Sequence, residues 1–144
     1  MNNSPTGGSV GLLSLLHTAY AAQAEIEAKL GTLGLSMAKL LALKVLFDAG
    51  EPLPLGQLAG RLSCVKSNVT QLVDRLEADG FVARKPDPHD RRTRLAELTV
   101  AGRKASKEGM RVQQETERDL LKPLSRSEAR QLAVLLAKLG RPGG

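Results

Sequence analysis

Four hydrogen-bonding side chains lie close together in one short segment: Ser67, Asn68, Thr70 and Gln71. Asn and Gln can bond to adenine through two hydrogen bonds, and Ser and Thr can bond to other base edges. The major groove of DNA admits a single helix, so a helix that reads bases needs short polar residues on one face and apolar anchors on the other. Lys66 and Arg75 can reach phosphates from the same segment. An ordinary exposed helix carries similar residues, so this segment alone leaves both interpretations open.

A second cluster of functional side chains is cationic and follows a few residues later. Its five cations, between positions 82 and 94, are Arg84, Lys85, Arg91, Arg92 and Arg94. Two carboxylates, Asp87 and Asp90, oppose these five and leave a charge of +3. An arginine at a hairpin tip can enter the minor groove, where narrow A·T tracts concentrate negative potential. The alternative is a solvated loop that is merely charged, although such loops are rarely so rich in arginine.

The remaining reactive side chains do not assemble into a catalytic or metal site. His17 and His89 are far apart and have no Cys or carboxylate neighbours at metal-ligand spacing. The chain has no Gly-rich phosphate loop, and its single cysteine has no evident His partner. Redox sensing by Cys64 is conceivable, but a small residue that packs a turn is the favoured interpretation. We therefore expect no enzyme activity, no metal and no cofactor.

Composition is consistent with one helical domain of 144 residues. Hydrophobic residues make up 42% and aromatic residues 2%, so Leu, Val and Ala must form the core, and Leu and Ala favour helix. A net charge of +6 weakly favours an anionic partner. The single cysteine, an N-terminus without a cationic region and an apolar run of only 12–16 predict a cytoplasmic protein without a membrane segment.

Spacing and capping residues predict the elements that position the two clusters. Apolar residues at intervals of three and four predict a helix over 12–30. A second helix begins after Ser36 and stops at Gly50, a short extended link follows between Pro52 and Pro54, and a third helix covers 55–62. Three residues of this third helix are expected to share one face: Leu58, Ala59 and Leu62.

The fourth helix is predicted over roughly 66–78, ending at Gly80, with its apolar side formed by Val69, Leu72, Val73 and Leu76. A strand at 81–84, a loop at 85–90 and a returning strand at 94–98 predict a hairpin with a basic tip. Another helix runs from Thr99 to Leu121. Ser125 and Glu128 form a capping box for the last helix, which is expected to bury Ala129, Leu132, Leu136 and Leu139.

This order predicts a mainly α protein with a small β-hairpin wing. Two helices joined by a turn at 63–65 and followed by a hairpin define a winged helix-turn-helix, with flanking helices at both chain ends.

Two other classes of function stay open for such a fold. A winged-helix protein-interaction module would need neither an arginine-rich wing nor a polar helix face. A non-specific architectural DNA binder would show strong salt dependence with little sequence discrimination.

Two stretches of the chain resemble the MarR family (multiple antibiotic resistance regulators). The first comprises Leu58-Ala59, the run 68–77 and Gly80, and the second comprises 87–92, Leu98-Thr99 and Gly102. The wing signature Asp-x-Arg…Leu-Thr falls on Asp90, Arg92, Leu98 and Thr99. The resemblance covers about 35–102 in sequence, and in helix order it covers the whole chain.

The resemblance implies a single domain, 1–144, in which helices at 10–32 and 100–140 dimerise and 36–99 is the winged helix-turn-helix. It implies that Arg92 enters the minor groove, that Asp90 orients Arg92 through a salt bridge, and that Ser67, Asn68, Thr70 and Gln71 face bases. We accordingly expect a homodimeric, sequence-specific repressor of transcription that binds an inverted repeat in double-stranded DNA. A small aromatic effector would release it.

Two details of this assignment stay open. His17 and Tyr20 are three residues apart on the first helix and could line an effector cleft, although a partly exposed edge of a dimer helix is the preferred interpretation. Family members often have Ser or Thr as the N-cap of the recognition helix, where this chain has Val65. We expect Ser63 or the Ser67 hydroxyl to cap the helix instead.

Overall fold

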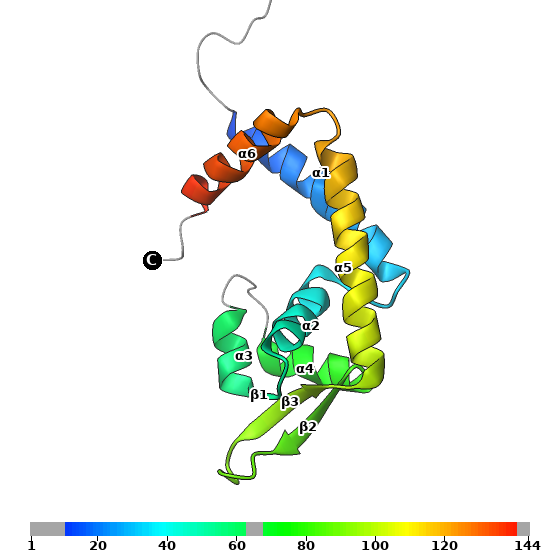
Figure 1. Ribbon diagram of the computed structural model, residues 1–144, viewed down its shortest axis with the longest axis vertical. Helices are drawn as coiled ribbons and strands as arrows, with labels where there is room; N and C mark the ends of the chain where they lie inside the picture. Colours follow the sequence, from blue (N-terminus) through cyan, green and yellow to red (C-terminus); the bar gives the residue numbers. More distant parts are fainter. Residues whose placement is uncertain (1–10, 63–67, 141–144) are drawn as a thin grey trace, which may run out of the picture.

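A computed structural model describes residues 11–62 and 68–140. This part of the chain is mainly helical with a small antiparallel sheet, as predicted (Figure 1). The elements in chain order are α1 (Leu12–Gly31), α2 (Met37–Ala49), β1 (Leu53–Pro54), α3 (Leu55–Arg61), α4 (Val69–Ala78), β2 (Val82–Pro86), β3 (Arg94–Leu98), α5 (Val100–Leu121) and α6 (Arg126–Leu139). The long helix α5 connects the sheet at one end of the molecule to α6 at the other.

Several predicted helix ends are confirmed by their capping bonds. The Ser36 hydroxyl accepts the Lys39 N–H at the start of α2, and the Thr99 hydroxyl accepts the Gly102 N–H at the start of α5. Ser125 and Glu128 form the expected capping box, in which the Ser125 backbone N–H donates to the carboxylate and lowers the pKa of Glu128. Gly80 follows α4 with φ +78°, a conformation that glycine adopts at little cost.

The sheet has one more strand than the sequence predicts. The link between Pro52 and Pro54 contains β1, whose Leu53 pairs with Ala96 of β3, and the strand order is β1-β3-β2. The second strand also continues to Pro86, opposite Arg94, where the sequence predicted a loop from residue 85. Because β2 is an edge strand, Pro86 can lack an N–H there without breaking the sheet.

The core is aliphatic and is formed by the sheet together with buried side chains from helices α1 to α5. Its fully buried side chains include Leu40, Leu43, Leu58, Val73, Leu76 and Val82. The predicted apolar side of α4 is confirmed, with Leu72 also buried and Val69 half-buried. Leu58 of α3 and Leu62, directly after α3, are buried, but Ala59 is exposed, contrary to the prediction. Residues 58 and 62 lie one turn apart, whereas residue 59 is rotated away from that line.

Helix α5 lies close against the rest of the winged domain because it has glycines at two contacts. A Cβ on Gly102 would lie 1.9 Å from the Phe81 carbonyl oxygen. A Cβ on Gly109 would lie 2.6 Å from Leu40 Cδ1 and 3.0 Å from Leu35 Cδ1. The first contact places the start of α5 against the start of the wing, and the second places the middle of α5 against Leu35 and Leu40.

The helices at the chain ends are largely uncovered. In α1 only Ile26 and Leu30 are buried, and α6 has no buried residue. The sequence predicted that α6 buries four apolar side chains, but Ala129 and Leu132 are half-buried and Leu136 and Leu139 are exposed. The reason is positional, since α6 extends beyond the far end of α5, away from the core (Figure 1). Within the described ranges, no helix is long and apolar enough to cross a membrane.

Candidate nucleic-acid interface

Helix α4 begins later than predicted, and its cap is a different residue. The sequence placed its start at Lys66 with Ser63 or Ser67 as the cap. In the structure α4 starts at Val69, and Asn68 Oδ1 accepts the N–H groups of Thr70 at 3.0 Å and Gln71 at 3.4 Å. Asn is among the best N-cap residues because its short side chain can reach these free amides. Lys66, Ser67 and the turn that contains Cys64 lie outside the described residues.

The remaining polar residues of α4 lie where the sequence predicted. Asn68, Thr70 and Gln71 are exposed together at the opening turn, and Arg75 is exposed one turn further on. The opposite side of α4 packs into the core through Leu72, Val73 and Leu76. The helix therefore presents short hydrogen-bonding groups to solvent at its N-terminal end, as a helix that reads bases requires.

The wing tip is shaped by hydrogen bonds from two carboxylates. Asp90 Oδ1 accepts the Arg92 backbone N–H at 3.0 Å, and Asp90 Oδ2 accepts the Thr93 hydroxyl at 3.0 Å. Asp87 Oδ1 accepts the His89 backbone N–H at 2.9 Å. The resemblance implied a salt bridge between Asp90 and the Arg92 side chain, and no such pair is present. Both Asp90 oxygens are instead engaged by the turn itself, a local bonding pattern typical of Asp in turns.

The cations of the wing fall into two groups. Lys85 forms an ion pair with Glu97 across the hairpin at 3.1 Å, and Arg84 pairs with Asp74 of α4. Arg91, Arg92 and Arg94 are exposed, and within the described ranges none of these three forms an ion pair. The positive charge available to a ligand therefore lies at the distal part of the wing.

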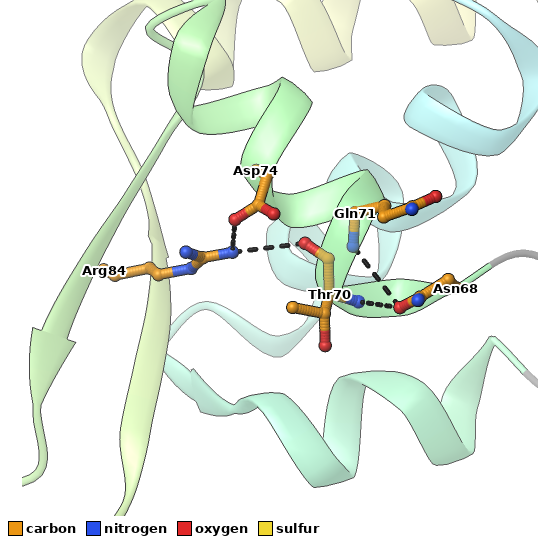
Figure 2. A network of polar contacts seen from close by, with 5 residues as sticks. All are labelled: Asn68, Thr70, Gln71, Asp74 and Arg84. Atoms are coloured by element: carbon orange, nitrogen blue, oxygen red, sulfur yellow. Dashed lines mark hydrogen bonds and ion pairs between the residues drawn. The ribbon is translucent and has the colours of Figure 1, made fainter.

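Arg84 connects the wing to α4 (Figure 2). Its Nη2 donates to Asp74 Oδ1 and, at 3.2 Å, to the Thr70 carbonyl oxygen. The sequence predicted Arg84 as a DNA contact and assigned no role to Asp74. No local pattern could have identified this pair, because the two residues are ten positions apart on different elements.

The base of the wing is fixed by backbone contacts. The Phe81 N–H donates to the Leu76 carbonyl at 2.9 Å, and the Thr99 N–H donates to the Phe81 carbonyl at 3.1 Å. The Thr99 hydroxyl donates to the Gly80 carbonyl at 2.6 Å. The end of α4, the start of β2 and the start of α5 thus meet around Gly80 and Phe81.

The two candidate effector residues lie at a distance from the core on α1. His17 and Tyr20 are both exposed, and Tyr20 retains 64% of its accessible surface. A concavity of about 680 Å³ lies on α6. It is lined by Ser127, Arg130, Gln131, Val134 and Leu135. His17 and Tyr20 therefore do not line this concavity in one copy of the chain.

The fold and this surface define a winged helix-turn-helix protein. The MarR family model matches residues 35–93, which include the helix-turn-helix and most of the wing. The chain is 35% identical over 107 residues to YkoM of Bacillus subtilis, an HTH-type transcriptional regulator, covering 74% of this chain and 69% of YkoM.

Solved structures give the same result. A probable transcriptional regulator from Pseudomonas aeruginosa is 32% identical, with a TM-score of 0.75 over 88% of this chain and 94% of that one. A mutant of E. coli MarR, complexed with operator DNA, is 26% identical, with a TM-score of 0.78 over 92% and 95% of the two chains. The chain belongs to the MarR family. It is a helix-turn-helix transcriptional regulator and not an enzyme.

Proposed function

We propose that the chain, as a homodimer, binds an inverted repeat in double-stranded DNA with sequence specificity and represses transcription. One observation carries this proposal: the polar opening turn of α4 and the exposed arginines of the wing belong to the same compact unit, at the end of the molecule remote from α6 (Figure 1). A recognition helix and a wing arranged in this way can contact a major groove and a neighbouring minor groove together. The operator complex of E. coli MarR, a protein of the same fold, supports the assignment.

Each predicted contact residue has a defined role in the proposal. Thr70 and Gln71 face base edges, together with Ser67 and the free amide nitrogen of Asn68. Arg75 and Lys66 bind phosphates, as do Arg91 and Arg94 on the wing. Arg92 enters the minor groove, and Asp90 shapes the turn that presents it. The other predicted contact, Arg84, binds Asp74 and the Thr70 carbonyl within the protein.

The dimer is proposed to form through the chain ends, 10–32 and 100–140, while 36–99 binds DNA. The exposed apolar residues support this division because they concentrate on α1 and α6: Leu12, Leu13, Leu15, Leu16, Tyr20, Val134, Leu135, Leu136 and Leu139. Symmetric association is the commonest way in which proteins cover such faces. A two-fold dimer would present two recognition helices to two equivalent half-sites.

Release by a small aromatic effector is the third part of the proposal. Tyr20 and His17 would contribute a stacking and a hydrogen-bonding group where α1 meets its dimer partner. Thermal-shift screening of phenolic compounds against the wild type and Tyr20→Ala tests this role. Stabilisation of the wild type alone supports the role, and equal responses of both proteins contradict it.

Selection of bound sequences from a random duplex library tests the DNA-binding function. The proposal expects an inverted repeat with half-sites about 10 bp apart, centre to centre. Gln71→Ala should relax the selected sequence at one position in each half-site, while Lys44→Ala, on α2, is the control variant and should select the same sequence. Random selected sequences with steep salt dependence would indicate an architectural DNA binder. Failure to retain any DNA would indicate a protein-interaction module.

The sign of regulation needs a separate measurement. A reporter gene behind a promoter that overlaps the selected site should fall in expression when the chain is present. Expression should recover with a chain carrying Arg92→Ala. Increased expression with the wild type would indicate an activator. This outcome would contradict the repressor assignment but not the proposed DNA binding.

A further inference from the structure

Arg84 differs from the other arginines of the wing in the direction of its side chain. It follows the buried Val82 on the same face of β2, one step closer to the wing tip, and its partner in the sheet is the buried Ala96. Its side chain is only 24% exposed and points from β2 toward α4 (Figure 2). Arg84 therefore lies on the face of the sheet that packs against the helices, just beyond the apolar core.

One terminal nitrogen of the Arg84 guanidinium is engaged inside the protein, and the Nε atom is buried. Nη2 donates both to the Asp74 carboxylate and to the Thr70 carbonyl oxygen, and Nε is buried without a hydrogen-bond partner. A phosphate that approached this guanidinium would have to compete with the Asp74 carboxylate, which already pairs with it. The exposed arginines at positions 91, 92 and 94 have no such competing partner within the described ranges.

The Arg84 bonds lie toward the N-terminal end of α4, where they can restrain the orientation of this helix relative to the wing. Near its C-terminal end, α4 is held to the residue before β2 by the Phe81 N–H, which donates to the Leu76 carbonyl. Arg84 binds the opposite end, because Thr70 is the second residue of α4 and Asp74 lies one turn further on. The start of α4 is thus bonded to β2, and its end is bonded to the residue that precedes β2, an arrangement expected to restrain rotation of the wing about Gly80 and Phe81.

We propose that Arg84 and Asp74 are positioning residues that fix the angle between the recognition helix and the wing, and that Arg84 does not itself bind DNA. We call the contact of Arg84 with Asp74 and the Thr70 carbonyl the Arg84 bridge. This inference rests on the proposed function, because the angle matters only if helix and wing contact DNA together. A free protein that already has this angle loses less conformational freedom on binding than one with a mobile wing.

The sign of the effect of Asp74 distinguishes this role from simple charge attraction. Asp74 is 55% exposed and lies on the helix that faces DNA. Removing its negative charge should tighten binding if attraction to phosphates dominates, and would also free Arg84 to reach a phosphate. Removing it should weaken binding if the Arg84 bridge positions the wing. The two hypotheses therefore predict opposite changes for the same substitution.

A double-mutant cycle on operator affinity tests the proposal, with Arg84→Met, Asp74→Ala and the double variant measured across a salt series. Methionine keeps much of the aliphatic length of Arg84 and removes only the guanidinium. We expect each single variant to bind roughly fivefold more weakly and the double variant to bind no more weakly than either, because coupled residues are not additive. The dependence of log affinity on log salt should stay that of the wild type, whereas loss of a phosphate contact lowers the slope by about one.

Lys85→Met is the matched control because it removes one cation from the adjacent position of β2, where the side chain is exposed and pairs with Glu97. We expect its affinity to stay closer to that of the wild type than the affinity of Arg84→Met. Tighter binding by Asp74→Ala, additive effects, or a slope reduced by about one in Arg84→Met would overturn the proposal. Circular dichroism of each variant excludes loss of folding as the cause.

Amide hydrogen exchange of the free protein provides a readout that does not depend on DNA. Exchange in β2 and β3 should become faster to the same extent in Arg84→Met, Asp74→Ala and the double variant, and should not change in Lys85→Met. Unchanged exchange would overturn the bridge even if the variants bind DNA poorly. If the wild type selected no DNA sequence, the proposed function would fail, while the exchange result would still decide whether the bridge restrains the wing.

Discussion

At the scale of single residues, Asp90 is an acid whose proposed role is to support binding to a polyanion. Its two oxygens hold the Arg92 backbone N–H and the Thr93 hydroxyl, so the carboxylate sets the conformation of the turn that carries Arg92. The negative charge of Asp90 would repel phosphates, whereas its hydrogen bonds stabilise the turn that carries Arg92. The balance between these effects is measurable because they respond differently to substitution.

We expect Arg92→Ala to weaken operator binding by about 1–3 kcal/mol and to lower the salt slope by about one, because a groove contact and a cation are lost. Asp90→Ala should also weaken binding, although it makes the wing more basic, because the turn loses both acceptors. Asp90→Asn keeps an acceptor for the Arg92 N–H and should retain more affinity than Asp90→Ala. Affinity across a salt series measures all three variants. Tighter binding by Asp90→Ala would contradict the role of the turn.

Asn68 combines two roles that substitution can separate. Asn68→Ala should reduce the free energy of unfolding by about 1 kcal/mol, because α4 loses its N-cap. Asn68→Asp keeps the cap oxygen and should keep the stability, but it places an acid at the turn proposed to face DNA and should weaken binding. Urea unfolding and operator affinity, measured in parallel, test the pair. Full affinity in Asn68→Asp would show that this position lies away from the DNA.

At the scale of elements, the packing of the wing against α5 depends on the close approach between Gly102 and the Phe81 backbone. The Phe81 carbonyl lies where a Cβ of residue 102 would be, and the same carbonyl accepts the Thr99 N–H. The backbone atoms of Phe81 cannot move aside as the end of a flexible side chain can. The start of α5 and the start of β2 must therefore move together if this contact changes.

Gly102→Ala should consequently destabilise the fold by at least about 1–3 kcal/mol, the cost typical of overpacking, even though alanine favours helix. Thermal unfolding followed by circular dichroism measures the effect. Gly31→Ala is the matched control, since no atom lies within 4 Å of a Cβ built at this helical glycine. Equal stability of the two variants would contradict the close approach as the cause.

At the scale of the whole molecule, the distribution of exposed apolar side chains predicts the oligomeric state. We expect a stable dimer at micromolar concentration in sedimentation experiments. Leu136→Glu, at a position 49% exposed on α6, should produce a monomer because it places a charge in the proposed interface. Ala59→Glu, at an exposed position of α3 outside the proposed dimerisation segments, should leave the dimer intact. A monomeric wild type would contradict the assignment of the chain ends to dimerisation.

The amino-acid sequence by itself determined the parts of this protein that depend on local interactions. The caps at Ser36, Thr99 and Ser125 and the stop at Gly80 follow from hydrogen bonds and backbone preferences within a few residues. The apolar side of α4 follows from helical periodicity. The bond between Asp90 and the Arg92 N–H is equally local, because Asp side chains commonly bond to the backbone N–H two residues later in turns. This bond was predictable from the spacing, but the family resemblance favoured a salt bridge to the Arg92 side chain instead.

Only the tertiary structure decided the features that depend on distant partners. Residues 53 and 54 form a strand because β3 lies beside them, and a two-residue segment has no periodicity of its own. Arg84 is directed to α4 because the fold brings Asp74 and the Thr70 carbonyl within reach. The apolar face of α6 stays exposed because the core ends before that helix begins. Local pattern determines which side chains are apolar or charged, but the packing of distant elements determines what each one contacts.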